Sequence, residues 1–565
     1  MGALGAFTFV LHSHLPYARL AGRWPHGEEW LHEAASETYI PLLQTLYDLK
    51  EAGVNFRLTI GITPILGEQL ADADVIEHFD QYLDAKIEAA KNDIVYFAEA
   101  ETADEHLGKL AAWYKDWFEG IKNAFDARFH RDIIGAFREL QDESYIEIIT
   151  CAATHGYLPL LGRDSSINAQ IKMGVRSYER LFGRAPRAIW LPECAYRPAY
   201  FEGKHERPGI ETFLAENNLK LFFSETHTIT GGQPVGIAAG DVIGPYGAIK
   251  RRYVIPETPL KPTPERKSTT YAAYYVSNSI AGPKAEEHSG VSVIGRNNRT
   301  GQQVWSAEIG YPGDPDYREF HKKAGTSGLQ YWRVSGPGVD LGFKDYYYPE
   351  WAAAKVDQHA EDFAHLVDDL LRKHNTKTGQ FGLISSNYDT ELFGHWWFEG
   401  ISWLGKVLKF LADDAEVELT TASTYLEEHP PTEVLNLPES SWGSAGSHFT
   451  WDNPDTHWMW SPIHEAEVRM EKLTAQYPQA TPEEHGVLSQ AARELLLLQS
   501  SDWPFLVTTG QAREYSIRRF SQHIERFDKL AESLEKGAPN VGLADEYWEL
   551  DKVFPDIDYR WFAER

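Results

Sequence analysis

Apolar stretches of strand length alternate with amphipathic helical stretches over roughly the first 400 residues of the chain. Two consecutive parallel strands need a crossover between them, and an amphipathic helix supplies one. The alternation therefore predicts an α/β fold whose parallel strands are closed, or nearly closed, into a barrel. The predicted strands cover residues 7–11, 55–66, 145–161, 188–193, 219–226, 291–298 and 382–389.

The rest of the chain does not show this alternation of strands and helices. Residues 76–140 are helical, and residues 245–290 are rich in Pro, Lys, Glu, Ser and Thr, which predicts a long, mobile surface loop. Strand signals fade after about residue 412, residues 436–462 form an aromatic loop, and helices follow. Thr481 begins one of these helices as its N-cap. We predict a barrel of residues 1–85 and 139–412, a helical insert of residues 86–138 and a C-terminal helical domain of residues 413–565.

Composition restricts the function. The 565 residues are enough for two or three domains. The formal net charge of −29 argues against nucleic acid and anionic membranes as partners. The 18 Trp and 28 Tyr residues partly cluster in polar surroundings, as in sugar-binding surfaces, although large cores also use Trp. Two cysteines, no signal-peptide features and no 18-residue apolar run predict a cytoplasmic enzyme.

Polar residues stand where the predicted strands end, which is where barrel enzymes carry their chemistry. Two are carboxylates, and a converging pair of carboxylates is what glycoside chemistry requires. Either acid could instead cap a helix or pair with an arginine. The strand-end candidates are His12, His14, His155, Glu193, Arg296 and Asp389.

Two other chemistries start from the same residues. His12 and His14 could bind a metal together with an Asp, as in a barrel-type deacetylase. We expect only one of these two histidines to face the site, because side chains alternate along a strand. Cys194 could be a thiol nucleophile, but the same alternation would turn it away from the barrel mouth.

The motifs "LHSHLPY", "TCAATHGYLPLL", "WLPECAY", "NYDTELFGHWWFEG" and "WSPIHEAE" occur in this order along the chain. On these motifs the chain resembles glycoside hydrolase family 57, and within it the 1,4-alpha-glucan branching enzyme group, from residue 5 to about residue 525. The resemblance implies a (β/α)7 barrel with a small helical insert and a C-terminal helical domain that completes the active site.

The resemblance also implies a retaining double displacement on an α-1,4-glucan. Glu193 matches the nucleophile and Asp389 the general acid/base, with an expected carboxyl separation of about 5–5.5 Å. We expect burial or the charge of Glu193 to raise the pKa of Asp389. No cofactor and no metal are implied. The positions that match substrate-binding residues are His12, His14, Trp24, Trp30, His155, Tyr246, Arg296, Trp305, Gly313, His395, Trp442, Trp451 and Asp502.

Three of these positions carry a further argument. The segment that holds Trp442 and Trp451 has too little aliphatic content to be a core segment, which favours cleft positions for both rings. Tyr246 matches the tyrosine of a loop that covers the cleft, and residues 250–290 exceed the usual length of this family. The loop bears on whether a glucan hydroxyl or water reaches the intermediate first.

The leading hypothesis is a branching enzyme that cuts an α-1,4 bond and transfers the chain to a 6-hydroxyl, acting as a monomer or homodimer. The alternatives on the same scaffold are an α-amylase-type hydrolase and a 4-α-glucanotransferase. The more distant alternatives are a metal-dependent deacetylase and a catalytically silent glucan-binding protein.

Overall fold

The computed structural model describes residues 2–23, 25–232, 243–244, 247–248, 264–280, 287–306 and 309–565. Seven parallel strands within these ranges form the core sheet, in the order β12-β1-β2-β3-β4-β7-β11. Their bounds are β1 Gly5–Ser13, β2 Leu58–Ile62, β3 Ile146–Cys151, β4 Ala188–Trp190, β7 Leu221–Ser224, β11 His288–Gly295 and β12 Gly382–Asp389.

The two ends of this sheet come together. Just after β11, the backbone N–H of Asn297 donates to the carbonyl of Ser385 in β12, with an N···O distance of 2.9 Å. Strand β10 (Ala273–Ser277) runs antiparallel to β11, and Tyr271 before it accepts a bond from Leu383 of β12 at 2.9 Å. The ring of seven strands is thus nearly closed, and the (β/α)7 barrel that we expected is confirmed.

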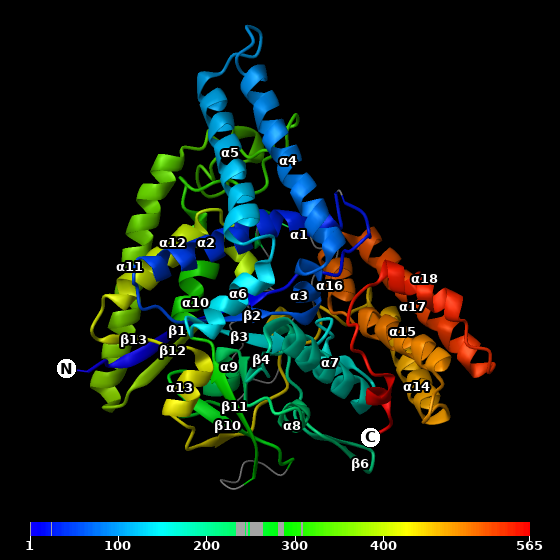
Figure 1. The fold of residues 1–565 in the computed structure, drawn as a ribbon. Helices are drawn as coiled ribbons and strands as arrows, with labels where there is room; N and C mark the ends of the chain where they lie inside the picture. The colour runs from blue at the N-terminus through cyan, green and yellow to red at the C-terminus, as the bar shows by residue number, and fades with distance from the viewer. Residues whose placement is uncertain are drawn as a thin grey trace.

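Helices cover the outside of the barrel and bury its apolar strands (Figure 1). All nine residues of β1 are buried. The ring of Phe9 in β1 stacks on Phe363 with centroids 6.0 Å apart and meets Trp403 edge-on at 5.9 Å. The barrel helices are α1 Glu28–Ala34, α2 Ile40–Glu51, α3 Pro64–Leu70, α6 Ile133–Asp142, α7 Asp164–Phe182, α8 Ile210–Glu216, α9 Thr226–Thr230, α10 Asn298–Trp305, α11 Pro349–Thr378, α12 Gly400–Ala412 and α13 Ala422–Glu428.

The helical insert is a two-helix projection that rises from the barrel, drawn in blue and cyan at the top of Figure 1. It consists of α4 (Ala73–Tyr96) and α5 (Glu105–Asn123). The Asp72 side chain caps α4 by accepting from the N–H groups of Asp74 and Val75. The boundary that we expected at residue 86 therefore falls inside α4, because this N-cap precedes it.

The predicted end of the barrel domain at residue 412 also differs from the structure. Strand β13 (Val417–Leu419) pairs with β1, and β14 (Val434–Leu435) pairs with β10. Residues up to Leu435 thus contribute to the barrel sheet. Strand β10 lies within the predicted loop of residues 245–290, so part of that stretch is a sheet strand. Strands β13 and β14 are too short to give a periodic signal, and β10 stands in a stretch rich in Pro, Lys, Glu, Ser and Thr that predicts a loop.

The C-terminal domain is a group of helices beside the barrel, drawn in orange and red in Figure 1. Thr481 caps α15 through a capping box with Glu484, as expected. Helix α15 packs against α17, and its residues 495–498 are fully buried leucines. The helices are α14 Trp460–Gln476, α15 Pro482–Leu498, α16 Asp502–Thr509, α17 Arg513–Glu535 and α18 Val541–Leu550.

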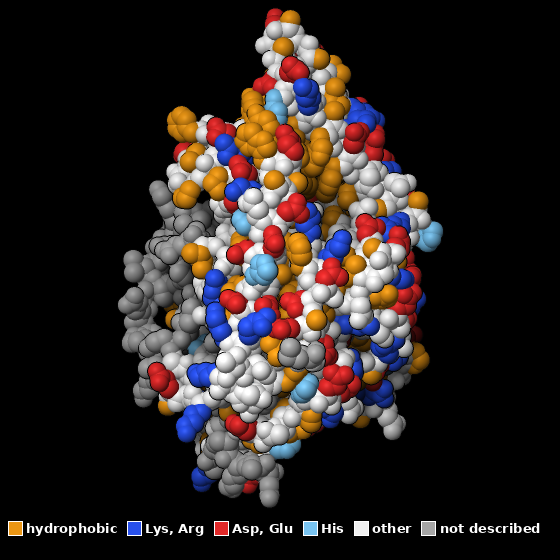
Figure 2. Space-filling model, turned by 90° about the vertical axis from the view of Figure 1, so that its left-hand side faces the viewer, with side chains coloured by type: hydrophobic (Ala, Val, Ile, Leu, Met, Phe, Trp, Pro, Cys, Tyr) orange, Lys and Arg blue, Asp and Glu red, His pale blue; other side chains and the backbone are white. Residues whose placement is uncertain are grey.

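The face drawn in Figure 2 carries acidic and basic side chains in mixture, with apolar side chains gathered in its upper part below the tip of the projection. Opposite charges are thus interspersed on this face despite the net charge of −29. Every helix within the described ranges is too short or too polar to cross a membrane.

Candidate active site

The carboxyl ends of the parallel strands bring the predicted catalytic residues to one edge of the barrel. In the pairing of β1 with β12, His12 lies opposite Asp389. His155 follows β3 and Glu193 follows β4, and these two strands are also neighbours. The charge of Asp389 contributes to the raised pKa of Glu193.

We had expected Glu193 at the end of a strand, but it lies in a tight turn. Strand β4 ends at Trp190, and residues Pro192–Cys194 form a 3-10 turn. Proline lacks the N–H that a continued strand ladder would need. Glu193 adopts φ 60° and ψ 27°, a left-handed conformation, and Cys194 follows with φ 48°. Cys194 is buried beneath the turn, so burial rather than strand alternation removes its thiol from the cleft.

An aromatic loop between the barrel and the C-terminal helices fixes this turn. The indole N–H of Trp442 donates to Oε2 of Glu193 at 2.6 Å, and the backbone N–H of Trp442 donates to the Glu193 carbonyl at 3.0 Å. Tyr196 and Ser440 exchange two backbone hydrogen bonds, at 2.8 and 3.0 Å. The candidate nucleophile is therefore held at its backbone and at one carboxylate oxygen.

Three histidines line the same site. Nε2 of His12 lies 3.1 Å from Nε2 of His155, and the His14 ring stacks on His155 with centroids 3.9 Å apart. The expectation that only one of His12 and His14 would face the site is wrong, because residues two apart in a strand point to the same side. Burial, followed by the neighbouring His14, lowers the pKa of His12 and of His155 well below the usual value, so both rings are neutral.

The C-terminal domain supplies part of the site. Nε2 of His14 lies 3.0 Å from Oδ1 of Asp502, and Nδ1 of His155 lies 2.8 Å from the hydroxyl of Ser501. Nδ1 of His14 lies 3.1 Å from the Thr63 hydroxyl. We missed Ser501 and Thr63, because no local pattern distinguishes a hydroxyl that meets a distant histidine.

A further acid lies next to Asp389. Glu391 Oε1 accepts a hydrogen bond from the backbone N–H of His14 at 3.1 Å and another from the hydroxyl of Tyr39. Burial raises the pKa of Glu391 to about 8, although the Tyr39 bond acts in the opposite direction. We missed this residue, whose position two residues after Asp389 could have drawn attention to it.

Both candidate catalytic acids have raised pKa values. Burial is the main cause and raises the pKa of Glu193 to about 8, with the charges of Asp389 and Asp502 adding to it and the Trp442 bond opposing it. Burial raises the pKa of Asp389 to about 6, while His14 and Arg296 act to lower it. The Glu193 side chain remains 17% exposed, so a ligand can reach it.

Arg296 lies at this edge as well. Its Nη2 lies 3.2 Å from Oε1 of Glu225, and its guanidinium carbon lies 6.0 Å from the centre of the Trp442 ring. Burial raises the pKa of Glu225, and the charge of Arg296 opposes this. We missed Glu225, although it ends the stretch "LFFSE" after β7 and the same strand-end rule could have found it.

The remaining predicted positions do not form one group. Trp451 is fully buried and stacks on Tyr157 with centroids 4.2 Å apart, so its predicted cleft position is wrong. Trp451 belongs to the large apolar core that the barrel shares with the C-terminal helices, so the aromatic loop enters a core despite its few aliphatic residues. His395 lies 3.1 Å from Oε2 of Glu37, with no direct contact to either catalytic acid recorded among the described residues. Trp30 packs edge-on to Tyr515 at 5.3 Å.

Trp305 is partly buried at the end of α10, and Gly313 is exposed in a 3-10 turn. Trp24 and Tyr246 lie outside the described residues.

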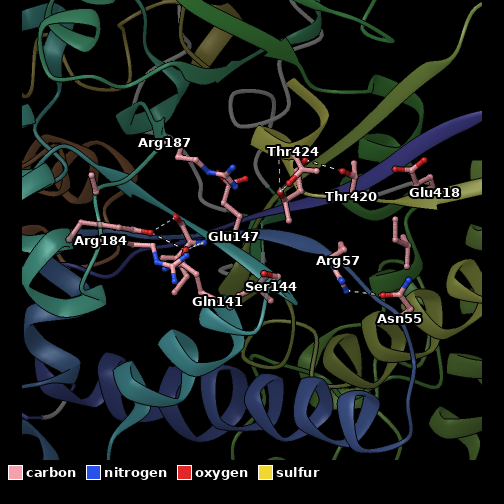
Figure 3. Close-up of a pocket in the computed structure, with 16 residues that line it drawn as sticks. Asn55, Arg57, Gln141, Ser144, Glu147, Arg184, Arg187, Glu418, Thr420 and Thr424 are labelled. Carbon is pink, nitrogen blue, oxygen red and sulfur yellow. Dashed lines mark hydrogen bonds and ion pairs between the residues drawn. The ribbon is translucent and has the colours of Figure 1, made fainter. Parts of the chain in front are cut away.

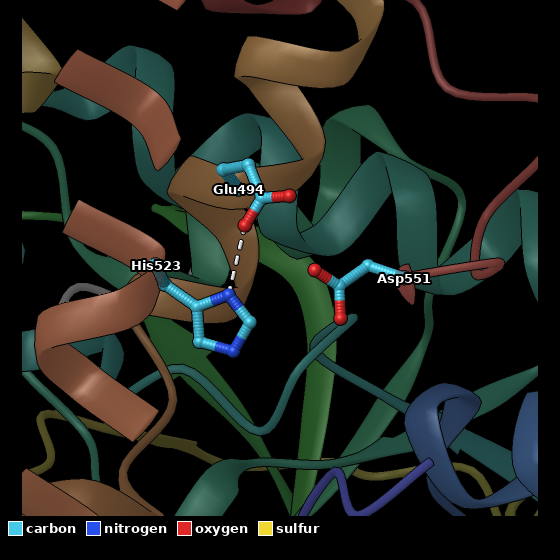
Figure 4. A group of neighbouring side chains, drawn as sticks. All are labelled: Glu494, His523 and Asp551. Atoms are coloured by element: carbon cyan, nitrogen blue, oxygen red, sulfur yellow. Dashed lines mark hydrogen bonds and ion pairs between the residues drawn. The ribbon is translucent and has the colours of Figure 1, made fainter. Parts of the chain in front are cut away.

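One further group of His and carboxylates lies in the C-terminal domain, away from this edge. Glu494, His523 and Asp551 are buried close enough to hold a metal ion (Figure 4). Nδ1 of His523 lies 2.8 Å from Oε2 of Glu494, and Asp551 pairs with Arg526 and, at 4.0 Å, with Arg519. Because the two arginines already balance the two carboxylates, the charge pattern favours a buried ion network that ties the C-terminal helices together.

Comparisons with known proteins agree with this arrangement. A family model described as glycosyl hydrolase family 57 matches residues 8–438, which end just after β14. A second model, described as 1,4-alpha-glucan branching enzyme, C-terminal, matches residues 462–562. The second match contains Ser501 and Asp502.

Three proteins are similar over the whole chain. A 1,4-alpha-glucan branching enzyme of Thermococcus kodakarensis is 45% identical over 563 residues, 98% of this chain and 78% of that protein. Its crystal structure has a TM-score of 0.88 at 43% identity and covers 100% of this chain and 97% of that one. A branching enzyme of Pyrococcus horikoshii has a TM-score of 0.85 at 42% identity, with the same coverage. An alpha-amylase of Thermotoga maritima has a TM-score of 0.81 at 31% identity and full coverage of both chains.

Proposed function

From the fact that the chain belongs to glycosyl hydrolase family 57, we infer that it is a 1,4-alpha-glucan branching enzyme. The observation that carries this conclusion is the C-terminal region. It matches the branching enzyme model, and its Ser501 and Asp502 contact the site histidines directly. The enzyme cleaves an α-1,4 bond and transfers the freed chain to a 6-hydroxyl.

We propose Glu193 as the nucleophile. Its Oε2 accepts the Trp442 indole N–H, while Oε1 lies 3.9 Å from Nδ1 of His155, a nitrogen already engaged by Ser501. Oε1 is therefore the oxygen whose lone pair is free to attack the anomeric carbon. The Trp442 bond stabilises the negative charge that Glu193 must carry before it attacks and regains when it leaves.

We propose Asp389 as the general acid and base. As Oε1 bonds to the anomeric carbon, the bond from that carbon to the leaving oxygen breaks, and the Asp389 proton passes to that oxygen. Asp389 then accepts the proton of an incoming 6-hydroxyl, whose oxygen displaces Glu193. Burial favours the protonated form of Asp389, which the first step requires.

The acceptor decides between transfer and hydrolysis, since both reactions share the glucosyl–Glu193 intermediate. A hydrolase remains the second candidate, because a solved structure named an alpha-amylase is 31% identical over the full chain. The test is product analysis on linear amylose, counting reducing ends before and after a debranching enzyme, with Glu193→Gln as the control. New ends that appear only after debranching establish transfer. If the number of reducing ends rises without debranching, water is the acceptor.

We also propose that the enzyme works in glycogen biosynthesis in the cytoplasm, as a monomer or homodimer. Cys151 and Cys194 are both free and buried, as suits a reducing compartment. The net charge of −29 suits a neutral glucan better than nucleic acid or an anionic membrane surface. Sedimentation equilibrium with the purified enzyme distinguishes one copy from two.

A further inference from the structure

A second recess opens at the opposite end of the barrel from Glu193 and Asp389. It has a volume of about 720 Å³, within the range of small-molecule sites (Figure 3). Asn55 and Arg57 precede β2, Ser144 precedes β3 and Arg187 precedes β4, so the recess lies at the amino ends of the parallel strands. A ligand bound there would not compete with glucan in the catalytic cleft.

Two deeply buried side chains in this recess lack a hydrogen-bond partner on one atom each. Gln141 is 5% exposed, and its Oε1 accepts from the N–H of Ile148 at 2.7 Å, while its Nε2 has no partner. Glu147 is 4% exposed, and its Oε2 accepts from the N–H of Ser423 at 2.9 Å, while its Oε1 has no hydrogen bond. The open donor of Gln141 and Oε1 of Glu147, whose ion pair with Nε of Arg187 is 3.5 Å long, suit a ligand hydroxyl, which serves both.

Three arginines and two acids line the recess, namely Arg57, Arg184 and Arg187 with Glu147 and Glu418. Arg184 pairs with Asp142, and Arg187 pairs with Glu427 at 3.0 Å and lies 3.5 Å from Oε1 of Glu147. Arg57 has no ion pair among the described residues. Its Nη1 donates to Oδ1 of Asn55 at 3.0 Å and to the carbonyl of Phe56 at 2.6 Å, and the rest of its guanidinium fork has no such bond. The Arg57 guanidinium lies 5.4 Å from the centre of the Tyr145 ring, and its remaining N–H groups, without a carboxylate partner, suit a phosphate.

We propose that this recess binds a small sugar phosphate. Arg57 holds the phosphate, and Nε2 of Gln141 and Oε1 of Glu147 hold sugar hydroxyls. Thr420 and Thr424 line the same recess and offer further hydroxyl contacts. The Tyr178 ring is 2% exposed and offers no open face, so the site suits a single sugar unit rather than a stacked glucan chain.

Isothermal titration of the full chain tests the proposal, with glucose 6-phosphate as the probe and with inorganic phosphate and glucose as comparisons. We expect saturable binding of glucose 6-phosphate that is at least about tenfold tighter than binding of inorganic phosphate or of glucose. The phosphate-binding and the hydroxyl-binding groups of the recess then hold one molecule together. Saturating maltoheptaose in the catalytic cleft should leave this binding unchanged. Absence of binding, equal binding of inorganic phosphate, or displacement by maltoheptaose would each overturn the proposal.

Variants localise the site. Arg57→Gln should weaken glucose 6-phosphate binding about tenfold or more, while Lys409→Gln, which removes one positive charge from the exposed face of α12, should not. Gln141→Glu keeps the acceptor for the Ile148 N–H and replaces the unpartnered amide nitrogen by a carboxyl oxygen. Binding of glucose 6-phosphate should therefore weaken in this variant as well. Thermal unfolding monitors the fold of each variant. Unchanged affinity in a folded Arg57→Gln protein would show that the site is elsewhere.

Discussion

At the scale of single residues, Glu193 combines an unusual backbone with a demanding chemical role. A left-handed conformation in a residue other than glycine costs about 1–3 kcal/mol and persists only where surrounding contacts hold it. Here the contacts are the two hydrogen bonds from Trp442, one to the Glu193 carbonyl and one to Oε2. The turn thus depends on a residue 249 positions later in the chain.

Removing the indole N–H tests that dependence. Trp442→Phe keeps an aromatic ring but loses the bond that stabilises ionised Glu193, so the pKa of Glu193 should rise further. A hydrogen bond to a charged group is worth about 1.5–3 kcal/mol, which corresponds to a roughly 10- to 100-fold loss in kcat/KM at neutral pH. The measurement is kcat/KM against pH, in which the alkaline limb, set by the higher pKa of Glu193, should move to higher pH.

Trp190→Phe is the matched control for this variant. It also removes an indole near His12, but the Trp190 N–H has no hydrogen-bond partner. Its alkaline limb should stay where it is in the wild type. An unmoved limb in Trp442→Phe would mean that the indole does not act on the ionisation of Glu193.

The two raised pKa values predict the pH dependence of the wild type. With pKa values of about 8 for Glu193 and about 6 for Asp389, the two groups together hold one proton between these limits, and the reactive form, in which Glu193 is ionised and Asp389 is protonated, is the less populated arrangement. Below about pH 6 both groups are protonated and no nucleophile is present. Above about pH 8 both are ionised and no acid remains. We expect a bell-shaped kcat/KM profile with a maximum near pH 7, measured with initial rates on amylose; activity that stays constant to pH 9.5 would contradict it.

At the scale of elements, one arginine joins three parts of the fold close to the site. Arg19, five residues after His14, is almost fully buried and donates to Asp72 at the start of α4 at 2.9 Å. It also donates to the carbonyls of Glu549 and Leu550 at the end of α18, at 2.8 and 2.9 Å. The segment after β1 is thereby attached to the C-terminal domain that supplies Asp502.

Arg19→Met should loosen this attachment. The carboxylate of Asp72 and two helix-end carbonyls would lose their buried donor, so the thermal midpoint should fall by several degrees. KM for amylose should rise as well, because His14 and Asp502 lose their fixed distance. Arg560→Met, which removes an exposed pair with Asp558, is the control and should change neither quantity. A lower midpoint with an unchanged KM would limit Arg19 to a structural role.

What the sequence could predict depends on how clear a local signal each element carries. The long apolar strands and the capped helix at Thr481 were predictable, because each carries a periodic pattern or a specific cap. Strands β13 and β14 were not, because two or three residues give no period and their partners lie far along the chain, and β10 stands in a stretch rich in Pro, Lys, Glu, Ser and Thr. The same limit applies to the site, where Asp389 could be selected as a strand-end acid and Ser501 could not.

At the scale of the whole molecule, buried carboxyl groups control how stability changes with pH. Burial raises the pKa values of Glu193, Glu391 and Glu467 to about 8. Between about pH 4.5 and pH 8 these groups hold protons only in the folded state, so stability falls as the pH rises toward 8. Buried histidines such as His12 act in the opposite direction, but only below about pH 6.5, where the unfolded state takes up protons.

The midpoint of urea unfolding should therefore decrease from pH 6.5 to pH 8, where the carboxyl groups act alone, with each contributing up to about 1.4 kcal/mol per pH unit. Glu467→Gln should make this decrease shallower, since Gln can still accept from Gly162. Glu465→Gln, two residues away and exposed, is the control and should leave the slope unchanged. A midpoint that rises over this interval would contradict the prediction.

The pairing of β1 with β12 has a consequence for how the protein is made. Gly5 pairs with Gly382, so a ribosome that adds about 5–20 residues per second needs roughly 20 to 75 seconds between synthesising the two strands. Throughout that interval an apolar strand edge lacks its neighbour and invites binding by chaperones. Asp502 emerges later still. A nascent chain therefore lacks the Asp502 contact to His14 until this part of the C-terminal domain has been made.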